Sequence, residues 1–329
     1  MPRLFDVYIA VDWSARSVPS PRKQTRDAIW VAEALAEDST GDAPPISDSY
    51  WQTRLACRLY LHDRLLQHIS QGRRVFLGFD FAYGYPSGFA KALHLYKDQR
   101  DQEDLPAWRK VWNELSRLIQ DDENNHNNRF EVAAALNERC GGSPDGPFWG
   151  CPADCQSPTL SRKSPAQGYP YVTTRKIALE RLRWTDKSVR GVQPVWKLLG
   201  SGCVGGQTLV GIPTVCKLRD DPLLAPVSRV WPFETGFTPA TIPRTEPFIL
   251  HAEIWPSIAP NLYDHRSTIP DQGQVRAVVC WLRELDILHR LHELFAQPKE
   301  LSDEMVKACI EEEGWITGAG WRETGQSQG

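Results

Sequence analysis

The chain has 329 residues, 41% of them apolar, and a formal net charge of -3. This length and apolar content are ample for a buried core, and the slightly acidic balance excludes a protein that binds duplex nucleic acid through an overall basic surface. Arg3 and Asp6 interrupt any signal peptide, and no uncharged apolar run approaches membrane length. A cytoplasmic protein without a membrane partner is therefore expected.

The first quarter of the chain predicts the order strand, strand, strand, helix, strand. Extended segments are expected over 5–12, 27–33 and 46–51, with a polar connection over 14–26 between the first two. Apolar residues recur at helical spacing over 52–71, and Gly72 ends this helix. A buried strand over 75–80 follows.

The middle of the chain breaks this alternation. Helical patterns over 89–95, 108–119 and 130–136 are separated by Asn/Asp-rich and Gly/Pro/Cys-rich stretches. We therefore predict an α/β domain whose first part is 1–86 and whose second part is 196–329, with 87–195 as a large, mostly helical insertion. The second part is expected to hold strands over 228–233 and 248–253 and helices over 275–295 and 302–312.

Three of the predicted buried strands end in an acidic residue, namely Asp12, Asp80 and Glu253. If the first strand is central, with the Asp80 strand beside it and the Glu253 strand on the other flank, the three carboxylates face one cleft. Carboxylates this close repel one another unless a cation lies between them, and oxygen ligands favour Mg²⁺ or Mn²⁺ over zinc. The pattern predicts a metal-dependent phosphoryl-transfer site.

Each acidic residue also has a purely structural interpretation. Asp12 would cap the turn after its strand, Glu253 would be an edge-strand carboxylate paired with an arginine, and Asp271 would be the N-cap of the last long helix. The functional interpretation is best supported at Asp80. The turn Tyr83-Gly84-Tyr85-Pro86 follows it and would place aromatic rings at the carboxyl edge of the sheet, where ligands of open α/β sheets bind.

A second candidate site is the Gly-rich segment 196–207, which contains Lys197, Gly200 and Gly202. Glycines before a helix free backbone N–H groups to bind an anion, and Lys197 would add positive charge, which suits a phosphate near the metal. The segment is neither a Walker A loop nor a dinucleotide fingerprint, because the Gly-Lys-Ser/Thr end is absent. The alternative is a tight turn that packs closely on a helix.

Four landmarks of the sequence together resemble an uncharacterised bacterial family of the ribonuclease-H-like superfamily. They are Ala10-Val11-Asp12-Trp13-Ser14, Gly78-Phe79-Asp80-Phe81-Ala82-Tyr83-Gly84-Tyr85-Pro86, Ala252-Glu253-Ile254-Trp255-Pro256 and Asp271-Gln272-Gly273-Gln274. The resemblance implies an RNase H-like mixed sheet flanked by helices, and a metal-dependent acidic site at Asp12, Asp80, Glu253 and Asp271. Some similar proteins carry names from molybdopterin-guanine dinucleotide or cobalamin biosynthesis.

The chain departs from the family pattern at the last landmark. Related domains tend to place a second acidic residue one turn into the C-terminal helix, but here Asp271 is followed by Gln274 and Arg276. The fourth ligand is therefore missing or replaced, and Glu234 is a candidate substitute. Arg276 has two interpretations, a phosphate contact or a solvated helix residue.

Two functions follow from these patterns. The first is a Mg²⁺- or Mn²⁺-dependent hydrolase or phosphoryl-transfer enzyme that acts on a phosphodiester or nucleotide-like substrate, with Asp12, Asp80 and Glu253 as ligands. The second is a non-catalytic RNase H-like module that binds a nucleotide, a cofactor precursor or a protein, for example as an accessory in molybdopterin or cobalamin biosynthesis. A carboxylate from Asp271 or Glu234 that faces the other acids favours catalysis, whereas an arginine or lysine in that space favours the binding module.

The expected ligand is a small phosphorylated or nucleotide-like molecule, or a short single strand of nucleic acid, rather than a duplex. Tyr83, Tyr85 and Trp255 would stack on its base or ring, while the metal and Lys197 would hold its phosphate.

Overall fold

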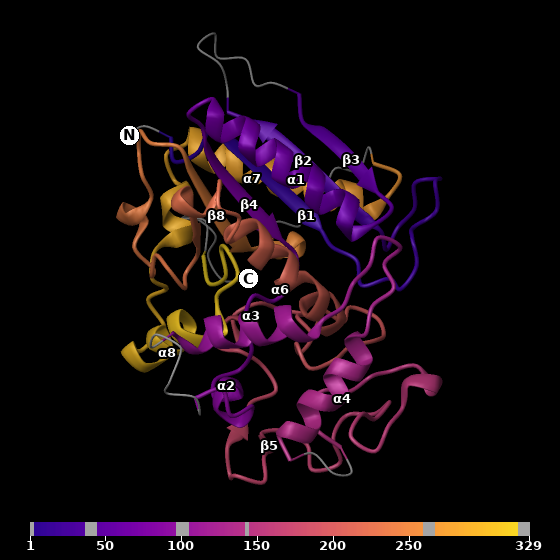
Figure 1. Cartoon of the computed structure of the whole chain (residues 1–329). Helices are drawn as coiled ribbons and strands as arrows, with labels where there is room; N and C mark the ends of the chain where they lie inside the picture. The colour runs from indigo at the N-terminus through magenta and orange to yellow at the C-terminus, as the bar shows by residue number, and fades with distance from the viewer. Residues whose placement is uncertain (1–2, 37–44, 97–104, 142–144, 259–266, 322–329) are drawn as a thin grey trace, which may run out of the picture.

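The computed structural model describes residues 3–36, 45–96, 105–141, 145–258 and 267–321. Its centre is a mixed six-stranded sheet in the order β3-β2-β1-β4-β8-β7, with helices on both faces (Figure 1). The strands are β1 (Val7–Asp12), β2 (Ile29–Leu35), β3 (Ser47–Trp51), β4 (Arg74–Phe79), β7 (Ser228–Val230) and β8 (Phe248–Glu253). β2 is antiparallel to β1 and to β3, whereas β1, β4, β8 and β7 run parallel.

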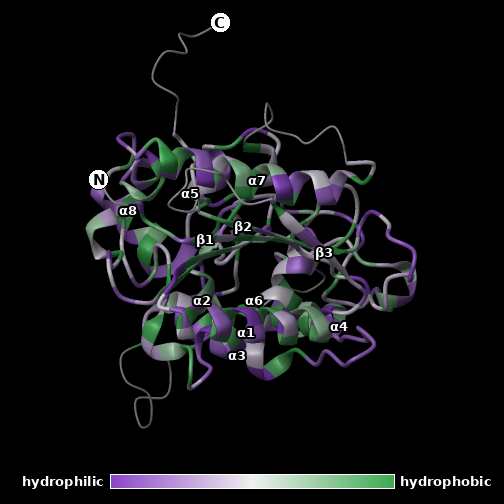
Figure 2. Ribbon diagram, turned by 90° about the horizontal axis from the view of Figure 1, so that it is seen from above, coloured by the Kyte–Doolittle hydropathy of each residue, from purple (hydrophilic) through white to green (hydrophobic). Residues whose placement is uncertain are grey.

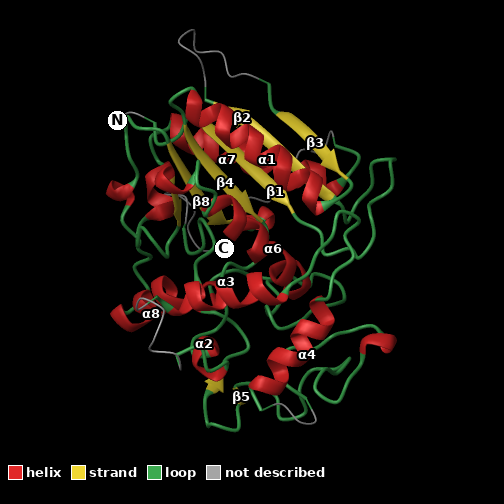
Figure 3. Cartoon of the chain, in the orientation of Figure 1, coloured by secondary structure: helices red, strands yellow, loops and turns green. Residues whose placement is uncertain are grey.

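Six helices correspond to predicted ones, with differences at their ends, whereas the helices over 184–187 and 205–219 are not among the predicted segments (Figure 3). The helices are α1 (Arg54–Ser70), α2 (Phe89–Ala92), α3 (Ala107–Leu118), α4 (Arg129–Arg139), α5 (Trp184–Lys187), α6 (Gly205–Arg219), α7 (Pro270–Ile287) and α8 (Asp303–Ala308). The helix predicted over 275–295 begins earlier, at Pro270, since proline is favoured in the first helical turn. It ends at Ile287 because His289 adopts a positive φ of 57°, and a separate 3₁₀ turn covers Leu291–Phe295. None of the helices within the described ranges is both long and apolar enough to cross a membrane.

Two helical layers bury the two faces of the sheet (Figure 2). On one side, α7 packs on β1 and β2, and on the other side lie α1, α3 and α6. Side chains of β1 alternate between these layers, so that Val7, Ile9 and Val11 join one core and Tyr8 and Ala10 the other. Burial on both faces explains why the strands read as continuous apolar runs.

The segment 87–195 differs from the prediction in its content of helix. It holds α2 to α5 and a small ribbon of β5 (Tyr171–Val172) and β6 (Ala178–Leu179), but turns and loops make up most of its described residues. The expectation of a mostly helical segment is corrected, because glycine and proline interrupt it repeatedly. Trp112 and Phe148 of this segment share one core with β1 and β4. The division at 87 and 195 stays a prediction.

Candidate functional site

The sheet register brings Asp12 and Asp80 together, as the sequence predicts. Val11 lies opposite Phe79 in the parallel pair of β1 and β4, and the Asp80 N–H donates to the Val11 carbonyl at 3.2 Å. The two aspartates therefore leave neighbouring strands at the same level of one edge. The Trp13 N–H donates to Asp80 Oδ1 at 2.7 Å, which fixes the orientation of this carboxylate.

An open cavity of about 610 Å³ lies at this edge, within the size range of small-molecule sites. It is lined by Asp12, Trp13, Ser14, Ala15, Arg16, Asp27, Asp80, Arg129, Leu198, Leu199, Gly200, Ser201, Gly202, Cys203, Val204, Gly206, Gln207, Trp255 and Asp271. Both sites predicted from the sequence, the acidic strand ends and the Gly-rich segment, thus contribute to one cavity.

Asp271 joins the acidic wall from the first turn of α7, where a carboxylate is favoured by the helix dipole. The N-cap of α7 is Ile269, so the interpretation of Asp271 as the N-cap is wrong by two residues. Asp271 Oδ2 accepts a hydrogen bond of 2.6 Å from the Asp27 N–H, which ties α7 to the residues before β2. Arg276, on the same helix, pairs with Asp48 of β3.

The acidic wall lacks a counter-charge within the described part of the chain. Burial raises the pKa of Asp12 well above its usual range, and the charges of Asp80 and Asp271 raise it further. Burial is also the largest cause that raises the pKa of Asp80, to about 7, and that of Asp271. No described residue donates a hydrogen bond to the Asp12 carboxylate, and none forms an ion pair with any of the three aspartates. Mutually repelling, desolvated carboxylates of this kind are typical of functional sites.

Glu253 has a different environment and does not line the cavity. Its strand, β8, lies beyond β4 rather than on the other flank of β1, and it is not an edge strand. Both carboxylate oxygens bind the buried Arg183 guanidinium at 2.7 Å, and Glu253 Oε2 also accepts from the Tyr83 N–H at 3.0 Å. Arg183 also pairs with Asp186 at 2.8 Å. The expectation that Glu253 opens onto the same cleft as Asp12 is corrected, because a buried arginine neutralises it.

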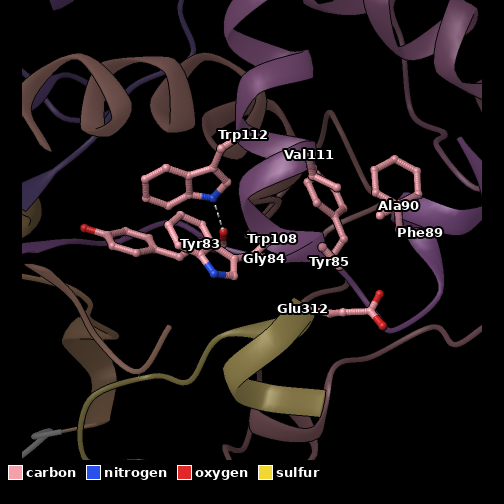
Figure 4. A pocket seen from close by; sticks show the side chains of 10 residues that line it. Tyr83, Gly84, Tyr85, Phe89, Ala90, Trp108, Val111, Trp112 and Glu312 are labelled. Carbon is pink, nitrogen blue, oxygen red and sulfur yellow. Dashed lines mark hydrogen bonds between the residues drawn. The ribbon is translucent and has the colours of Figure 1, made fainter. Parts of the chain in front are cut away.

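Tyr83 and Tyr85 are also placed differently from the prediction. Their side chains are only 1% and 2% exposed, and they line a separate, enclosed space of about 10 Å³ together with Trp112 (Figure 4). Such a space holds a single water at most. The Trp112 Nε1–H donates to the Tyr83 carbonyl at 2.7 Å and closes this wall (Figure 4). Of the three predicted aromatic stacking residues, only Trp255 lines the site cavity.

The Gly-rich segment forms the wall that leads into α6. Gly200 and Gly202 adopt positive φ angles of 110° and 67°, which favour glycine. The Lys197 Nζ donates to the Ser201 carbonyl at 3.0 Å, and Lys197 does not line the cavity. Lys197 therefore contacts its own loop in this structure, outside the cavity, and its contact with a phosphate stays a prediction.

The remaining candidate ligand, Glu234, lies outside the cavity and pairs with Arg219. Sequence reasoning missed two arginines that do line the cavity, Arg16 and Arg129. Arg16 lies shortly after Asp12 in the sequence, and this closeness could have predicted that it lines the site. Arg129 begins α4, and nothing in its local sequence connects it to the acidic residues.

Comparisons with protein-family models, with curated proteins and with solved structures found no match to this chain. The function is therefore argued from the cavity itself.

Proposed function

We propose that this protein is a Mg²⁺- or Mn²⁺-dependent hydrolase or phosphoryl-transfer enzyme that acts on a phosphoester bond of a nucleotide-like or phosphodiester substrate. One observation carries the proposal, the convergence of Asp12, Asp80 and Asp271 on one open cavity without a basic partner among the described residues. Their pKa values are raised because burial and mutual repulsion make the charged carboxylates unfavourable. A bound cation offsets that cost.

The donor set fits magnesium better than a metal that is caged by protein alone. Within the part of the chain that the structure describes, no group of three or more His, Cys, Asp or Glu side chains is arranged to hold an ion. Mg²⁺ is commonly bound by one or two carboxylates, with water and substrate phosphate as its other ligands. Asp12 and Asp80 would supply these carboxylates, with Asp271 beside them. The ion would polarise the phosphoryl oxygen and lower the pKa of a bound water.

The chain itself orients this acidic wall. The Trp13 N–H holds Asp80, and the Asp27 N–H holds Asp271, so both carboxylates are fixed by the backbone before a ligand arrives. Because the pKa of Asp80 is about 7, this group takes up and releases a proton near neutral pH in the metal-free protein. The solvent-open cavity admits a substrate without rearrangement of the core.

An RNase H-like fold is part of this proposal. It is supported by three antiparallel strands, β1 to β3, that lead through α1 into the parallel strand β4, with the acidic residues at the carboxyl ends of β1 and β4. This arrangement agrees with the resemblance of the sequence landmarks, although no solved structure tests it.

One observation favours the second candidate function, a non-catalytic module that binds a nucleotide or cofactor precursor. Arg183 occupies both oxygens of Glu253, so one of the acids that the family resemblance implies is not available as a ligand. Asp271, in contrast, lines the same cavity as Asp12 and Asp80, which favours catalysis. We therefore place the enzyme first.

The test is a thermal melt of the metal-free protein with and without Mg²⁺ or Mn²⁺. We expect either ion to raise the melting temperature of the wild type and to have little effect on Asp80→Asn. Glu234→Gln is the matched control, because this carboxylate lies outside the cavity and should leave the gain intact. An equal gain in wild type and Asp80→Asn would place the ion elsewhere and contradict the site.

An assay for product formation distinguishes the enzyme from the binding module. Dinucleotides, short single strands and molybdopterin or corrinoid precursors should be offered with Mn²⁺. Hydrolysis that disappears in Asp80→Asn supports the enzyme. Metal-dependent binding without product supports the binding module.

A further inference from the structure

The cavity that holds the acidic residues is also lined by two arginines without carboxylate partners in the described chain. The side chain of Arg16 has no hydrogen-bond partner there, and its Nε is buried. Arg129 is 7% exposed, and its Nη1 donates to Ser17 Oγ at 2.8 Å and Asn127 Oδ1 at 2.7 Å, while its buried Nε has no acceptor among the described groups. Both residues line the cavity.

The N-terminus of α6 lies directly beside Arg129. A Cβ atom added to Gly206 would lie 2.9 Å from the Leu198 carbonyl oxygen and 3.5 Å from Arg129 Nε, so the guanidinium packs closely against the start of the helix at a position that only glycine fits. No side chain caps α6, and no described group accepts from the backbone N–H of Gly206 or Gln207. Both residues line the same cavity. The N-terminus of a 15-residue helix with free N–H groups attracts anions.

The arginines are held in place by the fold rather than by a counter-ion. The buried Arg54 guanidinium donates to the Ser14 carbonyl at 2.9 Å and the Arg16 carbonyl at 2.8 Å, and so fixes the loop that carries Arg16. Burial, followed by the charge of Arg54, lowers the pKa of Arg129 to about 10. A desolvated cation of this kind is costly unless an anion pairs with it.

A purely structural role accounts for only part of Arg129. Its guanidinium lies 4.2 Å from the Phe130 ring centroid, which is a favourable cation–π contact. That contact and the two Nη1 hydrogen bonds leave Nε buried and unpaired, and Arg129 lines the same cavity as the residues that carry the free N–H groups of α6.

We propose that Arg129, Arg16 and the N-terminus of α6 form an anion subsite that binds a phosphate group of the ligand in the same cavity as Asp12 and Asp80. The subsite rests on the proposed function for the identity of the ligand, but its affinity for phosphate requires no metal. Arg129 Nε and the Gly206 and Gln207 N–H groups are the donors. The subsite assigns to Arg129 the role that the sequence predicted for Lys197, and it makes the ligand a phosphate ester with its charged group on the glycine-rich wall.

The experiment is a titration of the whole chain with inorganic phosphate in EDTA, against sodium chloride of equal ionic strength. We expect phosphate to raise the melting temperature of the wild type, and Arg129→Gln to weaken binding about tenfold or more, as expected for a lost charged hydrogen bond. Arg175→Gln, at an exposed arginine outside the cavity, is the matched control and should bind as the wild type does. Equal affinity in Arg129→Gln and wild type would overturn the proposal.

A second measurement uses the wild type alone, in case the Arg129 variant does not fold. In ¹⁵N-correlated NMR spectra, phosphate should shift the Gly206 and Gln207 amide signals more than those of other helix starts, and unchanged signals would also overturn the subsite. The phosphate titration contains EDTA and is therefore independent of the thermal melts with Mg²⁺. If phosphate raises the melting temperature in EDTA but Mg²⁺ does not raise it in the melts, only the metal site is refuted. A Mg²⁺ response without a phosphate response refutes only the subsite.

Discussion

Two groups of carboxylates at the ends of strands in this protein have opposite electrostatic environments. Asp12 and Asp80 end β1 and β4 without a basic partner in the described chain, whereas Glu253 at the end of β8 shares the buried Arg183 with Asp186. The strand ends are offset by one residue, because the register aligns Glu253 with Phe79 and Phe79 with Val11. Successive side chains of a strand point to opposite faces, so Glu253 points away from the face that carries Asp12 and Asp80. The difference teaches that a carboxylate at a strand end is a candidate metal ligand only where the fold places no basic side chain beside it.

The two groups should therefore affect stability in opposite ways. The Arg183 guanidinium donates five hydrogen bonds of 2.7–3.2 Å to Glu253, Asp186 and the Glu313 carbonyl, and its burial is compensated by two carboxylates. The carboxylates of Asp12 and Asp80 are desolvated without such compensation. The first group should stabilise the fold, and the second should destabilise it until a ligand binds.

The largest effect is expected for Arg183→Met. The substitution leaves Glu253 and Asp186 buried without their cation, and we expect the free energy of unfolding to fall by about 3–5 kcal/mol. Urea unfolding at neutral pH measures this loss. Arg175→Met, at an exposed position, is the control and should change little. A loss no larger than that of the control would mean that the Arg183 network contributes nothing to stability.

The next effect is the pH dependence that Asp80 imposes on the metal-free protein. Its pKa is about 7 in the folded state and near 3.8 in the unfolded state, so the folded state binds more protons between these values and stability falls as pH rises. Relative to Asp80→Asn, the wild type should lose roughly 2 kcal/mol between pH 5 and pH 7. Urea unfolding in EDTA at the two pH values measures the difference.

This comparison with Asp80→Asn removes the contributions of titratable groups that do not interact with Asp80. Burial lowers the pKa of His251 to about 3, so its contribution is present above the ordinary histidine pKa and is lost as pH falls, opposite in sign to that of Asp80. It occurs equally in both proteins. Parallel pH profiles for wild type and Asp80→Asn would show that Asp80 is not desolvated in the way that its pKa indicates.

The smallest effect is expected for Asp271→Asn. Asp271 Oδ2 already accepts from the Asp27 N–H, and the asparagine oxygen can keep that bond, so stability without metal should change by less than about 1 kcal/mol. The gain in melting temperature with Mn²⁺ should fall, but less than in Asp80→Asn. Thermal melts at matched Mn²⁺ concentrations test the order of the three proteins. A larger loss in Asp271→Asn than in Asp80→Asn would make Asp271 the main ligand.

The local sequence determined β1 to β4, α1 and the adjacent placement of Asp12 and Asp80. Apolar runs that are buried on both faces, a Gly72 stop after α1 and short connections leave few ways to arrange β1 to β4, and parallel pairing then places the two aspartates side by side. The same signals predicted 248–253 as a strand, which β8 confirms. They did not predict the long loops of 87–195, whose course depends on packing against the sheet.

Tertiary structure alone decided which charges meet. Arg183 lies 70 residues from Glu253 in sequence, and its guanidinium changes that residue from a predicted ligand into part of a buried ion pair. Arg129 reaches Gly206 from a different helix, while Lys197, within the Gly-rich segment itself, turns to the Ser201 carbonyl. Periodicity and spacing describe the backbone, whose hydrogen bonds are local or paired strand by strand. The energy of a charge pair depends on the distance between the two groups in space, and the separation of two residues along the sequence does not give that distance.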